Sequence, residues 1–209
     1  MKNCTRTIAF NTLSLLALST ALPAMAHHAM GKATPSTLMQ GLLSGFGHPV
    51  IGVDHLLFIL AVGVAVYCFG QGIAALLVFL PCALAGTLLH LYAPNVPYAD
   101  AWVALSLILL GVLLFRRSAL LDSQAALALF ALSGLVHGYA YGEAIIGAEP
   151  TPLLAYLTGF TLVQFAIALC GYAVARLIAT RKPAFALLKT AGGTLAAAGA
   201  AFMALTLAG

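Results

Sequence analysis

Charged residues are scarce in this sequence, since only 7% of its 209 residues are Asp, Glu, Lys or Arg. Hydrophobic residues make up 63% of the chain, and the mean hydropathy is +1.07. Soluble domains have roughly 45–50% apolar residues, so a water-soluble core of this size does not need so many. The composition excludes an ordinary soluble domain and predicts an integral membrane protein.

Several chemical signatures are absent as well. The four cysteines are scattered singly without CxxC spacing, so we expect neither a disulfide framework nor a thiolate metal site. No P-loop is present, which argues against ATP hydrolysis, and no H-E-x-x-H motif of a metalloprotease occurs. The formal charge of +4 is carried by basic residues beside apolar segments. Their position favours a role in membrane orientation, and we expect no nucleic-acid partner.

The first 26 residues have the pattern of a secretory signal peptide. Lys2 and Arg6 form a basic region, residues 8–22 are apolar, and residues 24–26 read Ala-Met-Ala, which is the type of site that signal peptidase cleaves. We predict removal of residues 1–26. The alternative is an uncleaved first helix.

Six apolar segments follow, each close to the ~20 residues that cross ~30 Å of hydrocarbon. Their expected bounds are 49–68, 72–92, 99–115, 124–147, 152–176 and 185–207. Before them, in a periplasmic segment spanning 27–47, Thr37 and Gln40 have the capping-box spacing of a short interfacial helix. The predicted fold is an all-α integral membrane protein, with a six-helix transmembrane bundle in residues 48–209 preceded by a cleavable signal peptide.

Basic residues set the expected orientation. Of the seven in the mature chain, only Lys32 lies on the predicted outer side. The other six flank the predicted inner ends of the helices: Arg116, Arg117, Arg176, Arg181, Lys182 and Lys189. This distribution follows the positive-inside rule and predicts a multi-pass protein of the bacterial inner membrane with both mature termini in the periplasm.

Few ionisable residues lie within the apolar segments, and each is a functional candidate because placing one in a bilayer costs at least ~2.5 kcal/mol. They are His48, Asp54 and His55 in the first segment, His90 in the second, and His137 and Glu143 in the fourth. The predicted topology places all six in the outer half of the membrane. A lone histidine near a helix end, such as His90, is also typical of an interfacial side chain.

These residue types suit a divalent late transition metal. Imidazole nitrogen binds nickel, cobalt, zinc and copper, and carboxylate oxygen offsets the charge of the ion. We expect the metal to be a transported substrate, with no permanently bound cofactor. His27 and His28 begin the mature chain after the predicted cleavage and are candidates to capture the ion, although they could also be an accident of the cleavage site.

Glycine spacing indicates how the polar segments meet. Gly134, Gly138 and Gly142 recur at four-residue intervals, which lets another helix approach closely. We expect the first segment to pack there, so that both polar sets share one cavity. The three helices before Asp122 and the three after it are expected to be inverted repeats, as in many transporters.

A resemblance to a known family rests on these residues. Residues 48–55, HPVIGVDH, resemble the H-P-x-x-G-x-D-H signature of the HupE/UreJ family of nickel and cobalt permeases. Residues 137–143, HGYAYGE, are similar to the second recurring segment of that family. The H-x4-D-H signature of other nickel/cobalt transporters fits less well, because five residues separate His48 from Asp54.

The resemblance implies a secondary permease, not an enzyme, that takes up nickel or cobalt across the inner membrane through a periplasm-facing His/Asp/Glu site. It implies that the metal supplies hydrogenase, urease or cobalamin synthesis. The residues alone leave two alternatives open. One is a membrane accessory or sensor protein that binds metal without transporting it. The other is an intramembrane metalloenzyme, for which no carboxylate is obviously placed as a base.

Overall fold

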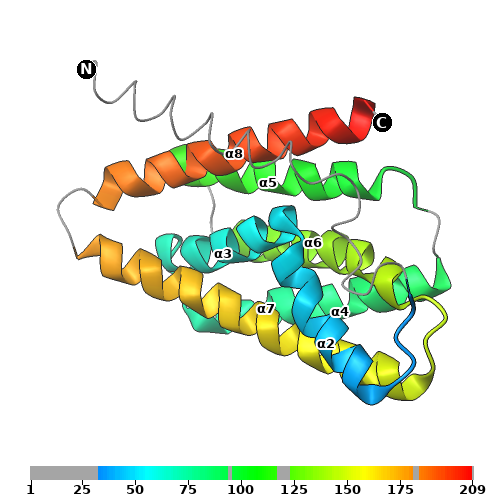
Figure 1. Ribbon diagram of the computed structural model, residues 1–209. Coiled ribbons are helices and arrows are strands. Elements are labelled where there is room, and N and C mark those ends of the chain that lie inside the picture. Colours follow the sequence, from blue (N-terminus) through cyan, green and yellow to red (C-terminus); the bar gives the residue numbers. More distant parts are fainter. Residues whose placement is uncertain (1–32, 94–95, 117–122, 181–183, 209) are drawn as a thin grey trace.

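A computed structural model describes residues 33–93, 96–116, 123–180 and 184–208 (Figure 1), and within these residues it contains helices and no strands. The α-helices are α2 (Leu38–Ile51), α3 (Val53–Cys68), α4 (Leu76–Tyr92), α5 (Ala99–Arg116), α6 (Ser123–Gly142), α7 (Pro150–Ala179) and α8 (Ala184–Ala208). Two one-turn 3-10 helices, η2 (Ile73–Ala75) and η3 (Glu143–Ile145), precede α4 and follow α6. The expectation of an all-α protein is confirmed. Among the described residues, five helices are long and apolar enough to cross a membrane, or up to six if the bent α2–α3 pair counts as one span.

The first apolar segment, expected as one helix over 49–68, is bent by 79° between α2 and α3. Pro49 has no N–H for a helical hydrogen bond, which weakens this turn. Gly52 then takes an extended conformation (φ −71°, ψ 102°), and its N–H bonds to the carbonyl oxygen of His48. The break places the end of one helix and the start of another inside the bundle.

Helix α2 begins at the predicted Thr37 cap, but the return bond of Gln40 goes to Ser36 and not to Thr37. Thr37 Oγ1 accepts a hydrogen bond from the N–H of Gln40 (3.2 Å), and Gln40 Oε1 accepts one from the N–H of Ser36 (2.9 Å). The helix is longer than the short interfacial helix expected within 27–47, because it continues to Ile51. Its outward face exposes large apolar side chains, among them Leu38, Met39, Leu43, Phe46 and Val50. Such a face suits lipid better than water.

The glycine face of α6 packs against α4, and the expectation that it packs against the first segment is wrong. A Cβ on Gly138 would overlap the carbonyl oxygen of Ala83, and one on Gly134 would lie 2.5 Å from that of Phe79. Thr87 Oγ1 also donates to the carbonyl oxygen of Gly138 (2.9 Å). Helices α4 and α6 run parallel in this close contact.

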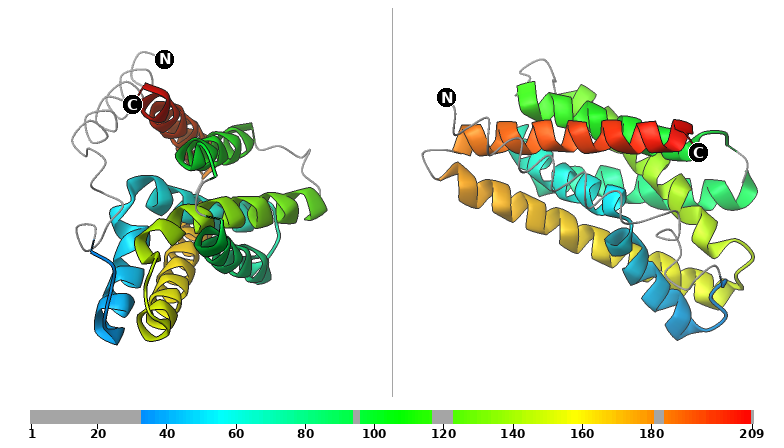
Figure 2. Two further views of the ribbon diagram at one scale, coloured as in Figure 1. Left: turned by 90° about the vertical axis from the view of Figure 1, so that its right-hand side faces the viewer. Right: turned by 45° about the horizontal axis from the view of Figure 1, so that its top comes forward.

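Helix α7 packs in the same way against α2 and α3. Gly45 of α2 lies against the backbone of Tyr156, and Gly171 of α7 lies against the backbone of Leu60 in α3. These contacts show that the bent α2–α3 unit runs parallel to α7. The remaining two helices, α5 and α8, form an antiparallel pair on one side of the bundle (Figure 2).

The α5–α8 contact is reciprocal. Gly111 of α5 approaches the backbone of Ala196 in α8, Gly192 of α8 approaches the backbone of Phe115 in α5, and the two glycines approach each other. Reciprocal contacts of this kind arise when two elements are related by a two-fold axis. The two parallel pairs correspond in the same way. If α3 is matched with α6 and α7 with α4, the α3–α7 pair corresponds to the α6–α4 pair. This is the arrangement that the expected inverted repeats require.

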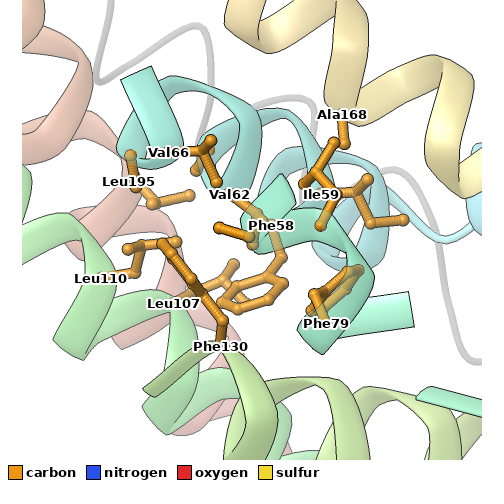
Figure 3. Close-up of a cluster of buried hydrophobic side chains, with 14 of the residues drawn as sticks. Phe58, Ile59, Val62, Val66, Phe79, Leu107, Leu110, Phe130, Ala168 and Leu195 are labelled. Atoms are coloured by element: carbon orange, nitrogen blue, oxygen red, sulfur yellow. The ribbon is translucent and has the colours of Figure 1, made fainter. Parts of the chain in front are cut away.

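We name the two ends of the bundle by the connections that they carry. The end at which α6 leads into α7 is the α6–α7 end, and the opposite end is the α7–α8 end. A cluster of buried apolar side chains occupies the bundle towards the latter (Figure 3). It includes Phe58, Ile59, Val62, Val66, Phe79, Leu107, Leu110, Phe130 and Leu195. Among the described residues, this cluster fills the part of the bundle between α3, α4, α5 and α6 with apolar side chains.

Candidate metal-binding site

The two halves of the chain meet at a pair of histidines. His55 lies in the first turn of α3 and His137 lies in α6, and both side chains are almost fully buried (1% and 0% exposed). Their Nδ1 atoms are 3.0 Å apart. Equivalent nitrogens of two imidazoles therefore face each other, although the two residues are separated by 82 positions in the sequence.

Ser106 of α5 determines which nitrogen of His137 carries the proton. Its hydroxyl donates to the carbonyl oxygen of Val103 (2.7 Å), so its single proton is already used. The Ser106 Oγ lies 2.8 Å from Nε2 of His137 and must accept a hydrogen bond from it. Neutral His137 then has its lone pair on Nδ1, and it accepts a hydrogen bond from Nδ1–H of His55. The nitrogen that faces His55 is therefore the one able to bind a metal.

Ser106→Ala should lower the affinity of His137 for a divalent metal ion about tenfold. Partners that orient a ligating imidazole typically contribute 10–100-fold in metal affinity, and without Ser106 the proton of His137 can move to Nδ1. The measurement is the dissociation constant for Ni²⁺ of the purified protein. Ser133→Ala is the matched control, because Ser133 is also a buried serine and lies one turn before His137. Equal affinities for the two variants would contradict the orienting role.

A third imidazole and two tyrosines extend the histidine pair. His48, at the end of α2, lies 5.9 Å from the His55 ring and 4.9 Å from the Tyr141 ring, measured between centroids. The hydroxyl of Tyr156 donates to the carbonyl oxygen of Tyr141 (3.0 Å) and lies 3.2 Å from Nδ1 of His48. The tyrosine oxygen thus accepts from Nδ1–H of His48, which leaves the lone pair of neutral His48 on Nε2.

Asp54 supplies a negative charge beside the pair. It lies in the first turn of α3, is half-buried, and accepts a hydrogen bond from the backbone N–H of His55 (2.9 Å). A carboxylate at a helix N-terminus is stabilised by the helix dipole. The break at Gly52 creates this N-terminus, so the bend itself places the carboxylate next to His55.

The other predicted ligands lie elsewhere. His90, near the end of α4, is buried against the ring of Tyr139, with 4.4 Å between centroids. Glu143 is exposed in η3, just after α6. His27 and His28 lie outside the described residues.

Among the described residues, no three His, Cys, Asp or Glu side chains lie close enough together to hold one ion. A complete shell of His48, Asp54, His55, His137 and Glu143 is thus not assembled in this conformation. The His55–His137 pair is the closest convergence of these ligands, and the wider ligand set stays a prediction.

An aromatic wall closes the pair on one side. The ring of Phe58 stacks on His137, with 3.9 Å between centroids and a tilt of 20°. Phe79 lies behind it at 6.2 Å and belongs to the same apolar cluster. The histidine pair is therefore at the boundary between the polar group and the apolar cluster.

Comparison with known proteins identifies the family. The profile described as "HupE / UreJ protein" matches residues 15–202, which is most of the chain. The chain belongs to the HupE/UreJ family. It is 30% identical over 197 residues to Protein HupE of Rhizobium leguminosarum bv. viciae, and the alignment covers 92% of this chain and 96% of that protein. No solved structure matches the chain. Membership confirms the resemblance seen in the motifs, and it supports a multi-pass membrane protein that takes up metal.

In this HupE/UreJ protein the sequence reasoning missed three neutral polar residues, Ser106, Tyr156 and Gln164. All three are buried in the middle or first half of apolar helices. The sequence analysis considered only His, Asp and Glu within the apolar segments as site candidates, so these three residues were not predicted. The available signal was a polar side chain inside an apolar segment, which in membrane proteins commonly bonds to another helix.

Proposed function

We propose that this protein is a secondary permease that takes up Ni²⁺ or Co²⁺ across the bacterial inner membrane. The observation that carries the proposal is the buried pair of imidazoles, one from each half of the chain, with the same nitrogen of each ring facing the other at 3.0 Å. A substrate ion bound between them would contact both halves at once. Its binding could therefore be coupled to their relative movement.

The spacing of the pair is compatible with one ion shared by both rings. Two imidazole nitrogens at about 2.0–2.1 Å from a metal are about 2.9 Å apart in cis positions at 90° and about 3.4 Å apart in a tetrahedron. The observed 3.0 Å is the length of a hydrogen bond between the two rings and lies between these values, so a small shift allows either geometry. His55 would need to move its proton from Nδ1 to Nε2 to ligate, which releases no net proton.

The charge distribution supports an orientation of the chain in the membrane. Arg116 and Arg176 lie at the α7–α8 end, which we assign to the cytoplasm, and the α6–α7 end faces the periplasm. His48, Tyr156 and Asp54 form the periplasmic approach to the pair. The apolar cluster beyond it prevents escape to the cytoplasm until the helices move.

The inverted repeats suggest what that movement is. Gly52 lies three residues before His55, and Gly134 likewise lies three residues before His137. The first half is broken at its glycine, whereas α6 continues through Gly134. We infer that the inward-open state exchanges the two conformations, with α6 bent at Gly134 and α2–α3 straightened.

Uptake by the purified protein in proteoliposomes tests the proposal. Radioactive Ni²⁺ and Co²⁺ should accumulate inside vesicles that contain the full chain, and the rates with and without an imposed membrane potential would identify the driving force. Vesicles that bind the ion without accumulating it would contradict transport and favour the metal-binding accessory. Detection of peptide or lipid turnover would instead favour an enzyme.

A further inference from the structure

Gln164 is a buried polar side chain that the site described above does not use. It lies at the middle of α7 and is 0% exposed. Neither its Nε2 nor its Oε1 has a hydrogen-bond partner among the described residues. A buried amide without partners is costly, and such a group in a native protein commonly marks a place for water or an ion.

Contacts on either side place Gln164 beside the break in the first span. Towards the α6–α7 end, Gly45 of α2 lies against the backbone of Tyr156. Towards the other end, Gly171 lies against the backbone of Leu60 in α3. Gln164 comes between these contacts, at the level of the α2–α3 break. Helix ends leave backbone groups unpaired, and transporters use broken helices near the bilayer midplane to bind their substrates.

The same face of α7 leads from the histidines to the apolar cluster. Four fully buried residues form it at four-residue intervals: Tyr156, Phe160, Gln164 and Ala168. The first contacts His48, and the second packs edge-to-face on Tyr141 at 4.7 Å. The fourth belongs to the apolar cluster. Gln164 is therefore the last polar side chain on this face before the apolar cluster.

Tyr141 provides a second buried polar group without a hydrogen-bond partner among the described residues, and its ring packs on Phe160, one turn before Gln164. The Tyr141 side chain is 0% exposed. Side chains of a helix tilt towards its N-terminus. Because α6 and α7 run in opposite directions, the side chains of Tyr141 and Gln164 tilt towards each other along the bundle.

We propose that the carboxamide of Gln164, assisted by the Tyr141 hydroxyl, is a second binding position for the divalent cation or its remaining water. This position lies at the level of the His55–His137 pair, and it offers the ion a second, weaker partner when the ion leaves the two imidazoles. The amide oxygen is a weaker ligand than imidazole for Ni²⁺ and Co²⁺. A weaker second position lowers the barrier to leaving the first, because conduction requires sites that also release the ion. The inference rests on the proposed function and assigns a residue to its release step.

Three variants test this position in full-length protein reconstituted in proteoliposomes, with Ni²⁺ as the probe. Gln164→Met keeps the length of the side chain without the amide, and Gln164→Leu is a second apolar replacement if the first folds poorly. Gln164→Glu restores an oxygen ligand. Thr158→Leu is the matched control, because Thr158 lies on the exposed face of α7 and its hydroxyl bonds only within the helix, to Leu154.

We expect the apolar variants to bind Ni²⁺ with an unchanged dissociation constant and to lower the maximal uptake rate about tenfold, the size of one polar contact with a charged group. Their melting temperature in detergent should stay equal or rise, because an unpaired buried amide is removed. Gln164→Glu should recover most of the rate, and the control should match wild type.

Wild-type uptake by an apolar variant that folds would overturn the role of Gln164, and so would a loss of Ni²⁺ affinity equal to the loss of rate. If His137→Ala still abolishes uptake in that experiment, the proposed function stands and only this inference fails. If wild-type protein binds Ni²⁺ without taking it up, both the proposed function and the role of Gln164 are contradicted.

Discussion

Replacing His137 with alanine should lower Ni²⁺ and Co²⁺ uptake by more than about 100-fold. The variant removes one of two facing imidazoles and leaves Ser106 and His55 without their partner. Loss of a partner that only orients a ligand costs 10–100-fold in affinity or activity, so loss of the ligand itself should cost more. The measurement is the initial uptake rate in proteoliposomes at equal protein content.

His90→Ala is the matched control for this variant. His90 is also a buried imidazole of an apolar helix, but it packs against Tyr139. At equal content of folded protein, we expect its uptake to stay within about threefold of wild type, because His90 contacts Tyr139 and lies outside the His55–His137 pair. Equal losses for both variants would show that any buried histidine matters and would contradict a specific role for the His55–His137 pair.

Gly63→Leu should have the largest effect on stability. A Cβ at this position of α3 would overlap the carbonyl oxygen of Ala168 in α7, which is backbone and cannot move aside alone. The two helices would have to separate, and overpacking of this kind costs about 3 kcal/mol. We expect a large drop in the folded fraction after detergent extraction, measured by size-exclusion chromatography.

Gly193→Ala is a suitable control for the glycine variant. A Cβ there would meet only the ring of Phe115, at 3.2 Å, and a side chain can shift by a few tenths of an ångström. The folded fraction should then stay close to wild type. A stable Gly63→Leu protein with normal uptake would contradict the close packing of α3 on α7.

The sequence predicted the class of fold because the relevant signals are local. The length and hydropathy of each apolar segment identify a helix, and the start of α2 follows from the Thr37–Gln40 spacing. The break at Gly52 was harder to predict. Proline and glycine at 49 and 52 indicated a distortion, but the 79° bend depends on how α2 and α3 each pack on α7.

The sequence of a single helix does not predict which other helix packs against it. The face of Gly134, Gly138 and Gly142 correctly predicts close approach, yet glycine spacing does not say which helix approaches, and the partner is α4. The convergence of His55 with His137 joins positions that have the same Gly-x-x-His spacing in the two expected repeats. Comparison of the Gly-x-x-His sequences at 52–55 and 134–137 could have indicated this pair.

X-ray absorption at the nickel edge of the Ni²⁺-loaded, purified protein tests most directly whether the two imidazoles share the ion. Wild type should show at least two imidazole ligands at about 2.0–2.1 Å, and His55→Ala and His137→Ala should each lose one. Identical spectra and unchanged Ni²⁺ affinity in the double variant would place the ion elsewhere and contradict the shared site.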